Sequence, residues 1–425
     1  MIQADLAVVG ISELATPEGR SARTGADLGR LRTIRDAAIA VRSGRIVFVG
    51  TERELREAVA LPPDGATIDA RGGTAVPGFV DAHTHLPFAG WREEEFNRRL
   101  SGATYAEIAA KGGGILSTVA ATRAASRSEL AALVRARLDA MLASGTTVVE
   151  AKSGYGLSLE EEIKQLEALA TGARDHPVRV VPTFLGAHTI PAERRDARER
   201  YLEEIVGEMI PEIARRELAA YADAFVDARA FTIDEARRVL LAARDAGLGV
   251  RLHADQLADD GAARLAAELR AASADHLEHV SDSGIEALAG AGTAAVLLPA
   301  ATFFLMQEAK PPARRLIDAG VPVAIATDFN PGTAPSEAMG ATLELASLTL
   351  RLSVDESLTA ATLNAAYALG MAEETGSIEV GKRADFAIHA VPNRYHLVYR
   401  FGMRRVATVV AGGRVVVADG RRCCA

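Results

Sequence analysis

Five polar residues end apolar, strand-like runs of the chain, and all five are of types that bind metal ions. The first run, GFVDAHTH, ends in His83 and His85, whose spacing of two places both imidazoles on one face of a strand. Later runs end in His253, His276 and Asp328. A single buried histidine is usually structural, but several imidazoles and a carboxylate at equivalent positions are costly to bury without a ligand. Three of these four imidazoles, together with the carboxylate, form a donor set that suits Zn²⁺ or Fe²⁺ and leaves positions open for water and substrate.

Such a donor set indicates hydrolysis. A dication lowers the pKa of a bound water toward ~7 and so supplies a nucleophile at neutral pH. Asp328, in contact with both metal and water, would accept the proton and later pass it to a leaving nitrogen. A metal-bound water with an adjacent carboxylate suits attack on a carbonyl or amidine carbon in a ring, but it does not determine which ring compound is the substrate.

Residues in the loops after these runs are candidates for choosing the substrate. Arg92 follows the first run by seven residues, and a guanidinium there would bind a substrate carboxylate in bidentate fashion. Tyr155 and His188 follow the second and third runs and reach the same place. Spacing alone supports a packing role for Tyr155 and a structural role for His188 as well as it supports substrate contacts for these two residues.

Eight strand-like runs alternate with helical segments between Pro77 and about Gly370, which predicts a (β/α)₈ barrel. Three helices carry capping-box pairs at their starts, namely Ser126 with Glu129, Ser158 with Glu161, and Thr232 with Glu235. The runs are GFVDAHTH, TTVVEAKSG, VRVVPTFLGAH, YADAFVDA, GVRLHADQ, SADHLEH, AAVLLPA and VPVAIATD, all apolar enough to be buried on both faces. Residues at the carboxyl ends of barrel strands meet at one mouth, where the chemistry of such barrels gathers.

The two ends of the chain are rich in β-hairpin signals and have few helical ones. IAVRSGRIVFVG turns at Ser43-Gly44, and RVATVVAGGRVVVADG turns at Gly412-Gly413. Each flank is too short for a core of its own, so we expect the two to pair into one composite β-sandwich beside the barrel. The predicted domains are residues 1–74 and 376–425 for the sandwich and 75–375 for the barrel.

Composition excludes several other classes of protein. The 425 residues carry a formal charge of −8, which argues against a nucleic-acid partner. The longest apolar runs are too short to span a bilayer, no signal peptide is visible, and no P-loop or dinucleotide-binding glycine motif occurs. The only cysteines are the adjacent pair Cys423 and Cys424, which is typical of a reducing compartment. We therefore expect a cytoplasmic protein with a small-molecule substrate.

The polar residues at the strand ends resemble those of the amidohydrolase superfamily, and the loops resemble those of the imidazolonepropionase family within it. The matching segments are HTHLPFAGWR, KGGG (111–114), KSGYGL, FLGAH, HADQ, SADHLEH and TDFNPGT. The resemblance implies hydrolysis of 4-imidazolone-5-propanoate to N-formimidoyl-L-glutamate, by a homodimer, in the degradation of histidine. It also implies one Zn²⁺ or Fe ion per subunit, held by His83, His85, His253 and Asp328. A second metal is not expected, because YADAFVDARAF has no bridging lysine and Lys152 lies on the second run.

The resemblance further implies roles for residues around the metal. His276 would bind the metal's water or the substrate, and Gln256 would orient a ring nitrogen, since an amide cannot shuttle protons. The substrate contacts would be Arg92 on the propionate, with Tyr155, His188, Gln256, Asn330, Gly332 and Thr333. The KGGG segment, residues 111–114, would be a flap or a plain loop.

Two alternatives use the same residues. A ring deaminase with one metal would release ammonia and would not need Arg92. A non-catalytic metal-binding barrel would keep the metal without hydrolysing any cyclic amide, but it would have no use for the proton relay that His276 and Asp328 offer together.

Overall fold

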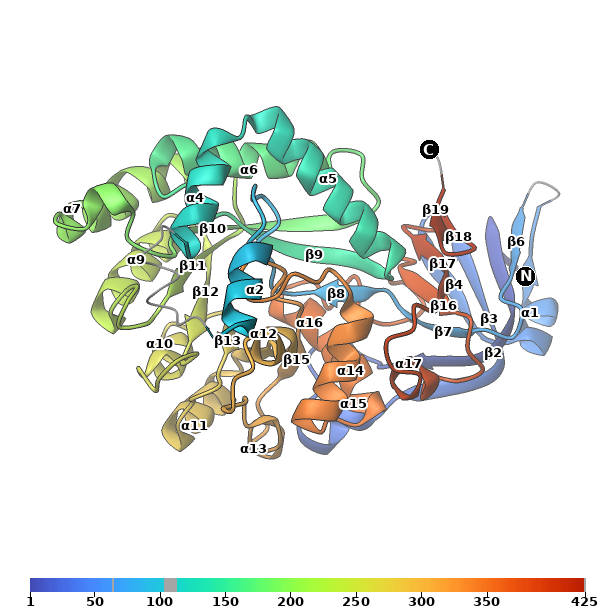
Figure 1. Ribbon diagram of the computed structural model, residues 1–425. Helices are drawn as coiled ribbons and strands as arrows, with labels where there is room; N and C mark the ends of the chain where they lie inside the picture. Colours follow the sequence, from blue (N-terminus) through green and yellow to red (C-terminus); the bar gives the residue numbers. More distant parts are fainter. Residues whose placement is uncertain (63–64, 103–112, 424–425) are drawn as a thin grey trace.

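The centre of the molecule is a barrel of eight parallel strands, whose order in the sheet is their order in the chain. The computed structural model describes residues 1–62, 65–102 and 113–423. The strands are β8 (Phe79–Asp81), β9 (Thr146–Lys152), β10 (Arg179–Ala187), β11 (Tyr221–Phe225), β12 (Gly249–Ala254), β13 (Ser273–His276), β14 (Ala294–Leu297) and β15 (Val323–Ile325) (Figure 1). They correspond one for one to the eight predicted runs, so the predicted barrel is confirmed.

The first and last strands meet through backbone contacts just beyond their ends. Thr84 forms a parallel bridge with Phe329. The His85 N–H donates to the Phe329 carbonyl at 2.9 Å, and the Asp328 N–H donates to the His83 carbonyl at 3.1 Å. These contacts fix the metal-type residues that follow β8 and β15 side by side.

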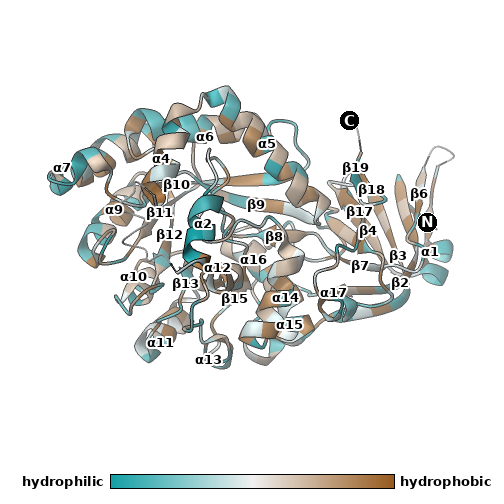
Figure 2. Cartoon of the chain, in the orientation of Figure 1, coloured by the Kyte–Doolittle hydropathy of each residue, from teal (hydrophilic) through white to brown (hydrophobic). Residues whose placement is uncertain are grey.

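Helices surround the barrel, and two of the three predicted capping boxes are present in full, at Ser126 and Thr232. At Ser158 only half of the box forms, because the hydroxyl accepts from the Glu161 N–H but the Glu161 carboxylate pairs with Lys164. The helices of this part are α2 (Glu93–Leu100), α4 (Ile115–Ala124), α5 (Arg127–Ala143), α6 (Leu159–Ala173), α7 (Arg198–Glu204), α8 (Ile210–Arg215), α9 (Ile233–Asp245), α10 (Ala262–Glu268), α11 (Asp282–Ala291), α12 (Pro299–Phe304), α13 (Ala313–Asp318), α14 (Met339–Leu350), α15 (Val354–Ala360) and α16 (Leu363–Ala368). The exposed helix α2 is largely hydrophilic, whereas apolar residues gather on the barrel strands (Figure 2).

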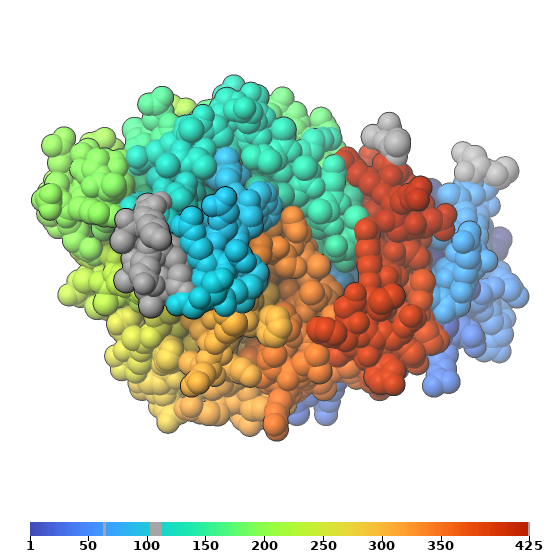
Figure 3. All heavy atoms as spheres, viewed as in Figure 1, coloured from blue at the N-terminus to red at the C-terminus, as the bar shows by residue number. Residues whose placement is uncertain are grey.

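Both ends of the chain build one mixed sheet beside the barrel, as predicted. Its path is β19-β18-β17-β16-β7-β2-β3-β4, with β6 paired to β2, and the predicted hairpins at Ser43-Gly44 and Gly412-Gly413 are present. The first and last parts of the chain lie at the same end of the molecule (Figure 3). The helices and strands in the two ends of the chain, inside and outside this sheet, are β1 (Ile2–Gln3), β2 (Leu6–Thr16), β3 (Arg32–Arg42), β4 (Arg45–Thr51), α1 (Glu52–Ala58), β5 (Val59–Ala60), β6 (Ala66–Asp69), β7 (Thr74–Pro77), β16 (Phe386–His389), α17 (His396–Tyr399), β17 (Val406–Ala411), β18 (Arg414–Ala418) and β19 (Arg421–Arg422).

The strand β7 joins the flanking sheet to the barrel. It pairs with β16 and β2 of the flanking sheet, and β8 of the barrel begins only two residues after it ends. The flanking sheet has an apolar core of its own, which includes Ile11, Leu14, Ile39 and Phe386. The domain division at residues 74 and 375 stays a prediction.

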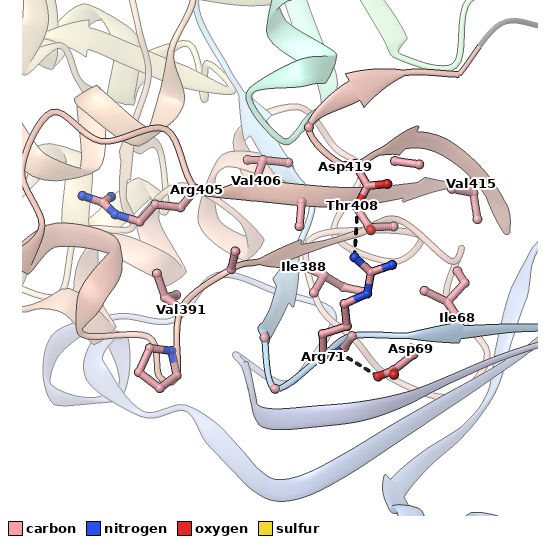
Figure 4. A pocket seen from close by; sticks show the side chains of 18 of the residues that line it. Ile68, Asp69, Arg71, Ile388, Val391, Arg405, Val406, Thr408, Val415 and Asp419 are labelled. Atoms are coloured by element: carbon pink, nitrogen blue, oxygen red, sulfur yellow. Dashed lines mark hydrogen bonds and ion pairs between the residues drawn. The ribbon is translucent and has the colours of Figure 1, made fainter.

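A cavity of about 830 Å³ lies in the flanking sheet (Figure 4). The exposed side chains of Arg71 and Asp419 pair across it, with Nη1 and Oδ1 3.4 Å apart, and the Arg71 N–H donates to Asp69. No histidine lines this cavity, so it offers no imidazole ligand for a metal. Within the described ranges, none of the helices is long and apolar enough to cross a membrane.

Candidate metal centre and active site

Five predicted site residues converge at the carboxyl ends of β8, β12, β13 and β15, and we call them the His/Asp cluster: His83, His85, His253, His276 and Asp328. Ligand-type atoms of His83, His85 and His253 lie within 4.8 Å of one another, as do those of His83, His276 and Asp328. Asp328 Oδ1 is 3.5 Å from His83 Nε2 and 3.6 Å from His85 Nε2. All five side chains are buried, so the geometry does not separate His276 from the four predicted ligands.

The protonation of His83 and His85 fits a metal ion. Burial holds the pKa of both imidazoles well below the usual range, and the charge of Lys152 adds to the effect at His83. They are therefore neutral at neutral pH, which is the form that binds metals. The buried Nε2 of His83 has no hydrogen-bond partner in the described part of the chain, although its Nδ1 lies 2.6 Å from Asp275 Oδ2. A ring nitrogen left without a partner in a dry interior is expensive, and a cation would satisfy it.

Buried charged residues on four barrel strands support the cluster, and we call them the charge layer: Glu150, Lys152, Asp223, Arg251 and Asp275. Asp275 contacts His83, and Asp223 Oδ2 lies 3.1 Å from His253 Nδ1. Lys152 Nζ lies 2.9 Å from both Glu150 Oε1 and Asp223 Oδ2. Carboxylates on the outer ring nitrogens fix the orientation of the imidazoles and raise their basicity.

The positive members of the charge layer stay charged inside the barrel. Burial lowers the pKa of Lys152, but Asp223 and Glu150 outweigh it and raise that pKa above its usual value. Arg251 donates to the carbonyls of Ala82 and Ala368 at 2.7 and 3.0 Å and lies 3.4 Å from Asp275.

Sequence reasoning missed the charge layer. The strands are largely buried, as predicted, but they are not purely apolar, and four of them carry the residues of the charge layer. Ionisable residues inside runs expected to be buried in a parallel sheet were the available signal, because burial forces them to pair.

A cavity of about 140 Å³ opens onto the His/Asp cluster. Every predicted site residue lines it except His83, which is fully buried, and Gly332. Ile115 and Phe225 line it without having been predicted. The full lining is His85, Arg92, Ile115, Tyr155, His188, Phe225, His253, Gln256, His276, Asp328, Asn330 and Thr333.

Arg92 is held in place from two sides. Its Nε and Nη2 donate to Glu95 Oε2 at 2.9 and 2.8 Å, and Glu95 Oε1 accepts from the Gly114 N–H and the Ser117 hydroxyl. A Cβ on Gly332 would overlap Arg92 Nη1, so any larger residue there would displace the guanidinium from its present position. Since Glu95 occupies the Nε–Nη2 edge, a substrate carboxylate would meet the Nη1–Nη2 end. The part of the predicted flap at residues 111–112 lies outside the described residues.

Aromatic rings form one wall of the cavity. His188 stacks on His85 with ring centroids 5.2 Å apart, and Tyr155 lies 5.3 Å from His188. Burial lowers the pKa of His188 to about 3, so its ring is neutral. Its Nδ1 lies 2.9 Å from the Gly154 carbonyl, which can only accept, so Nδ1 carries the hydrogen and Nε2 keeps a lone pair. Burial raises the pKa of Tyr155, which leaves its hydroxyl a donor.

The turn after β15 is held by Asn330. Its amide donates to the Asp328 carbonyl at 2.7 Å and to the Thr333 hydroxyl at 2.6 Å, and its oxygen accepts from the N–H groups of Gly332 and Thr333. The Thr333 hydroxyl lies 3.3 Å from Asp328 Oδ2. Asn330 thus shapes the turn that positions Asp328, and its predicted contact with the substrate ring stays a prediction.

The two candidate proton carriers have shifted pKa values. Burial raises the pKa of Asp328. Burial disfavours the charged form of His276, but Glu278 and Asp328 outweigh it and raise the pKa of that imidazole. Glu278 Oε1 lies 3.8 Å from His276 Nδ1 and accepts from the Thr302 hydroxyl. Gln256 lines the cavity, and its side chain makes no hydrogen bond to the residues that the structure describes.

Solved structures with this fold include a triazine hydrolase variant, with a TM-score of 0.78 and 20% identity over 99% of this chain and 96% of that one. An adenosine deaminase from Xanthomonas campestris matches with a TM-score of 0.73 and 21% identity, over 99% of this chain and 95% of that one. At such identities the likeness shows a shared fold.

Sequence relatives are much more similar. Residues 74–416 match the model of the Amidohydrolase family. Imidazolonepropionase from Symbiobacterium thermophilum is 52% identical over 418 residues, which are 98% of each chain. Imidazolonepropionase from Myxococcus xanthus is 46% identical over 421 residues, or 99% of each chain. The chain therefore belongs to the amidohydrolase family and, within it, groups with the imidazolonepropionases.

Proposed function

We propose that this protein hydrolyses the ring amide of 4-imidazolone-5-propanoate to N-formimidoyl-L-glutamate, a step in histidine degradation. One observation carries the proposal: the guanidinium of Arg92 lines the same small cavity as the His/Asp cluster. A small ring can therefore reach the cluster while its carboxylate tail reaches the arginine. The relatives named imidazolonepropionase support this substrate over other cyclic amides.

The proposed cofactor is one Zn²⁺ or Fe ion per subunit, with His83, His85, His253 and Asp328 as ligands. Three imidazoles and a carboxylate suit either metal. When bound, such an ion activates water as a nucleophile and polarises a carbonyl oxygen.

The protein's own residues handle the protons. Asp328 accepts a proton from the attacking water and delivers it to the ring nitrogen as the C–N bond breaks. The carbonyl carbon thus gains the water oxygen and becomes the new carboxylate. His276, whose pKa is raised mainly by Glu278 against burial, donates to the carbonyl oxygen as negative charge develops there.

Gln256 distinguishes ring opening from deamination. Its neutral amide can donate to or accept from a ring nitrogen, but it cannot carry a proton at neutral pH. It therefore orients the ring, and Asp328 and His276 carry the protons.

The remaining cavity residues bind the substrate. Arg92 holds the propionate through its Nη1–Nη2 end, Tyr155 donates a hydrogen bond, and the lone pair on His188 Nε2 accepts one. Asn330, Gly332 and Thr333 lie in the turn that faces the ring. The family resemblance supports a cytoplasmic homodimer.

The proposal is tested by mixing the purified, metal-loaded protein with imidazolone propionate generated by urocanase. We expect its ultraviolet absorbance to decay, the decay to stop after a chelator removes the metal, and no ammonia to appear. Absorbance loss with ammonia release would establish the deaminase instead. Absence of any chelator-sensitive decay would rule out the proposed activity.

Replacing Arg92 by Met is expected to lower kcat/KM by about 100-fold, mostly through KM, because a charge-assisted bidentate pair is worth about 2–3 kcal/mol. Metal content should not change, since Arg92 makes no contact with the cluster in the described structure. Arg98→Met is the matched control, because Arg98 lies on the same helix α2 and, among the described residues, pairs only with the exposed Glu94. Equal kcat/KM for the two variants would contradict the proposed binding of the substrate carboxylate by Arg92.

A further inference from the structure

A second cavity of about 330 Å³ adjoins the catalytic cavity, and Ile115 lines both. The start of α4, at Ile115 and Leu116, and the start of α7, at Arg198, both line it. Its lining includes Leu116 and Ile190 together with the arginines Arg195, Arg198 and Arg229. His188 lines the catalytic cavity and the next residue along the chain, Thr189, lines this one, so the two cavities share a second stretch of wall.

The charges around this second cavity do not cancel. Arg198 forms a two-pronged pair with Glu235, and Arg229 Nε lies 3.1 Å from Asp227 Oδ1. Arg195 is exposed and makes no hydrogen bond or ion pair with any residue in the described ranges. Among the residues that the structure describes, no acidic side chain lines the cavity, so its lining keeps the positive charge of Arg195.

We infer that this arginine-lined cavity is an antechamber that binds the carboxylate of a small organic anion before the anion enters the catalytic cavity. The identity of that anion as the imidazolone substrate rests on the proposed function, whereas the binding of a carboxylate does not. A volume of about 330 Å³ suits a ligand of this size.

The negative overall charge of the chain explains why a positively charged antechamber would help an anionic substrate to bind. A protein with a formal charge of −8 repels an anionic substrate at long range. A concave site with positive charge beside the catalytic cavity raises the local concentration of that anion, and such focusing increases association rates by 10- to 1,000-fold in other systems. The antechamber therefore acts on kcat/KM and not on the chemical step.

Kinetics of Arg195→Ala and Arg195→Glu test this inference. We expect kcat/KM at low ionic strength to fall by about 5-fold for Ala and further for Glu, with kcat unchanged. The fall of kcat/KM with added salt should also become shallower, since the screened attraction is missing. Arg200→Ala is the matched control, because it removes the same charge five residues away, from an exposed side chain on α7 that does not line the cavity. Identical salt dependence in Arg195→Ala and Arg200→Ala would overturn the antechamber.

Binding of glutarate provides a test that needs no activity. In the Arg92→Met protein the proposed carboxylate site of the catalytic cavity is gone, so calorimetry with glutarate reports the antechamber. We expect binding to Arg92→Met and at least 5-fold weaker binding to Arg92→Met/Arg195→Ala. No glutarate binding to Arg92→Met, or equal binding to both, would overturn the inference. Arginine-dependent binding without hydrolysis of the imidazolone would sustain the antechamber and refute the proposed function alone.

Discussion

Replacing Asp328 by Asn is expected to lower kcat for the imidazolone by about 1,000-fold or more, with the fold intact. The proposed function gives Asp328 two roles, as a negative ligand oxygen for the metal and as the group that takes up and returns a proton, and its Oδ1 lies near His83 and His85. General acid–base catalysis alone contributes about 10²–10⁴ in rate, and an amide cannot provide it. Asparagine keeps the volume and the carbonyl oxygen, so the change isolates charge and proton transfer.

The backbone at Asp328 makes asparagine the right substitute. Its φ is +55°, in the left-handed region that most side chains avoid and that asparagine tolerates. Alanine or leucine there would add backbone strain, and a loss of activity would then have two causes. The bonds that Asn330 makes to the carbonyl of residue 328 and within the turn do not depend on the carboxylate.

Asp419→Asn is the control, because Asp419 also has a positive φ, of 47°, and lies in the flanking sheet with an exposed side chain. Metal content, melting temperature and kcat should be measured for both variants. We expect Asp419→Asn to match the parent in all three quantities. We expect Asp328→Asn to keep the parental melting temperature and to lose kcat, whether or not it also loses metal. A near-parental kcat in metal-loaded Asp328→Asn would show that another group moves the proton.

The barrel and the His/Asp cluster were predictable because both depend on local patterns. Buried strands alternate with capped helices, and the carboxyl ends of parallel strands meet at one mouth whatever the details of packing. The period-two spacing of His83 and His85 also fixes their common face without any knowledge of neighbours. His253, His276 and Asp328 could be added because each ends its own run.

Contacts across the barrel could not be predicted in this way. Asp275 is hydrogen-bonded to His83, which is 192 residues earlier in the chain and follows β8, a strand that is not a neighbour of β13 in the sheet. Such a contact depends on the tilt and closure of the barrel, which no periodicity in one sequence reports. Which edge of the Arg92 guanidinium pairs with Glu95 also depends on side-chain geometry and could not be predicted. The sequence shows only that the two residues are three positions apart.

Lys152 shows how an expectation can be right and incomplete. The sequence placed this lysine on the second strand and so excluded it as a bridge between two metals. The structure places it on β9, with its ammonium between the carboxylates of Glu150 and Asp223 and 3.9 Å from Asp275. A fixed cation at this depth balances acidic groups that orient the imidazole ligands.

Replacing Lys152 by Met is therefore expected to destabilise the metal-free protein by about 3–5 kcal/mol, because it leaves Glu150 and Asp223 buried without their cation. Methionine fills much of the same volume, so the lost charge dominates the effect. Metal affinity should fall as well, since Asp223 also contacts His253 and would no longer be held in place. Unfolding in urea without metal gives the first quantity, and metal titration of the folded variant gives the second.

Lys310→Met supplies the comparison, because Lys310 is exposed and the same substitution there should change the free energy of unfolding by no more than about 0.5 kcal/mol. The three carboxylates of the charge layer outnumber its two cations by one, so removing Lys152 raises the buried excess of negative charge from one to two. The excess can be relieved by proton uptake, and the stability of Lys152→Met should then rise more steeply than that of the parent as pH falls toward 5. If both variants unfold at the same urea concentration at pH 8, the buried acids do not need the lysine, and its proposed support of the metal ligands fails with it.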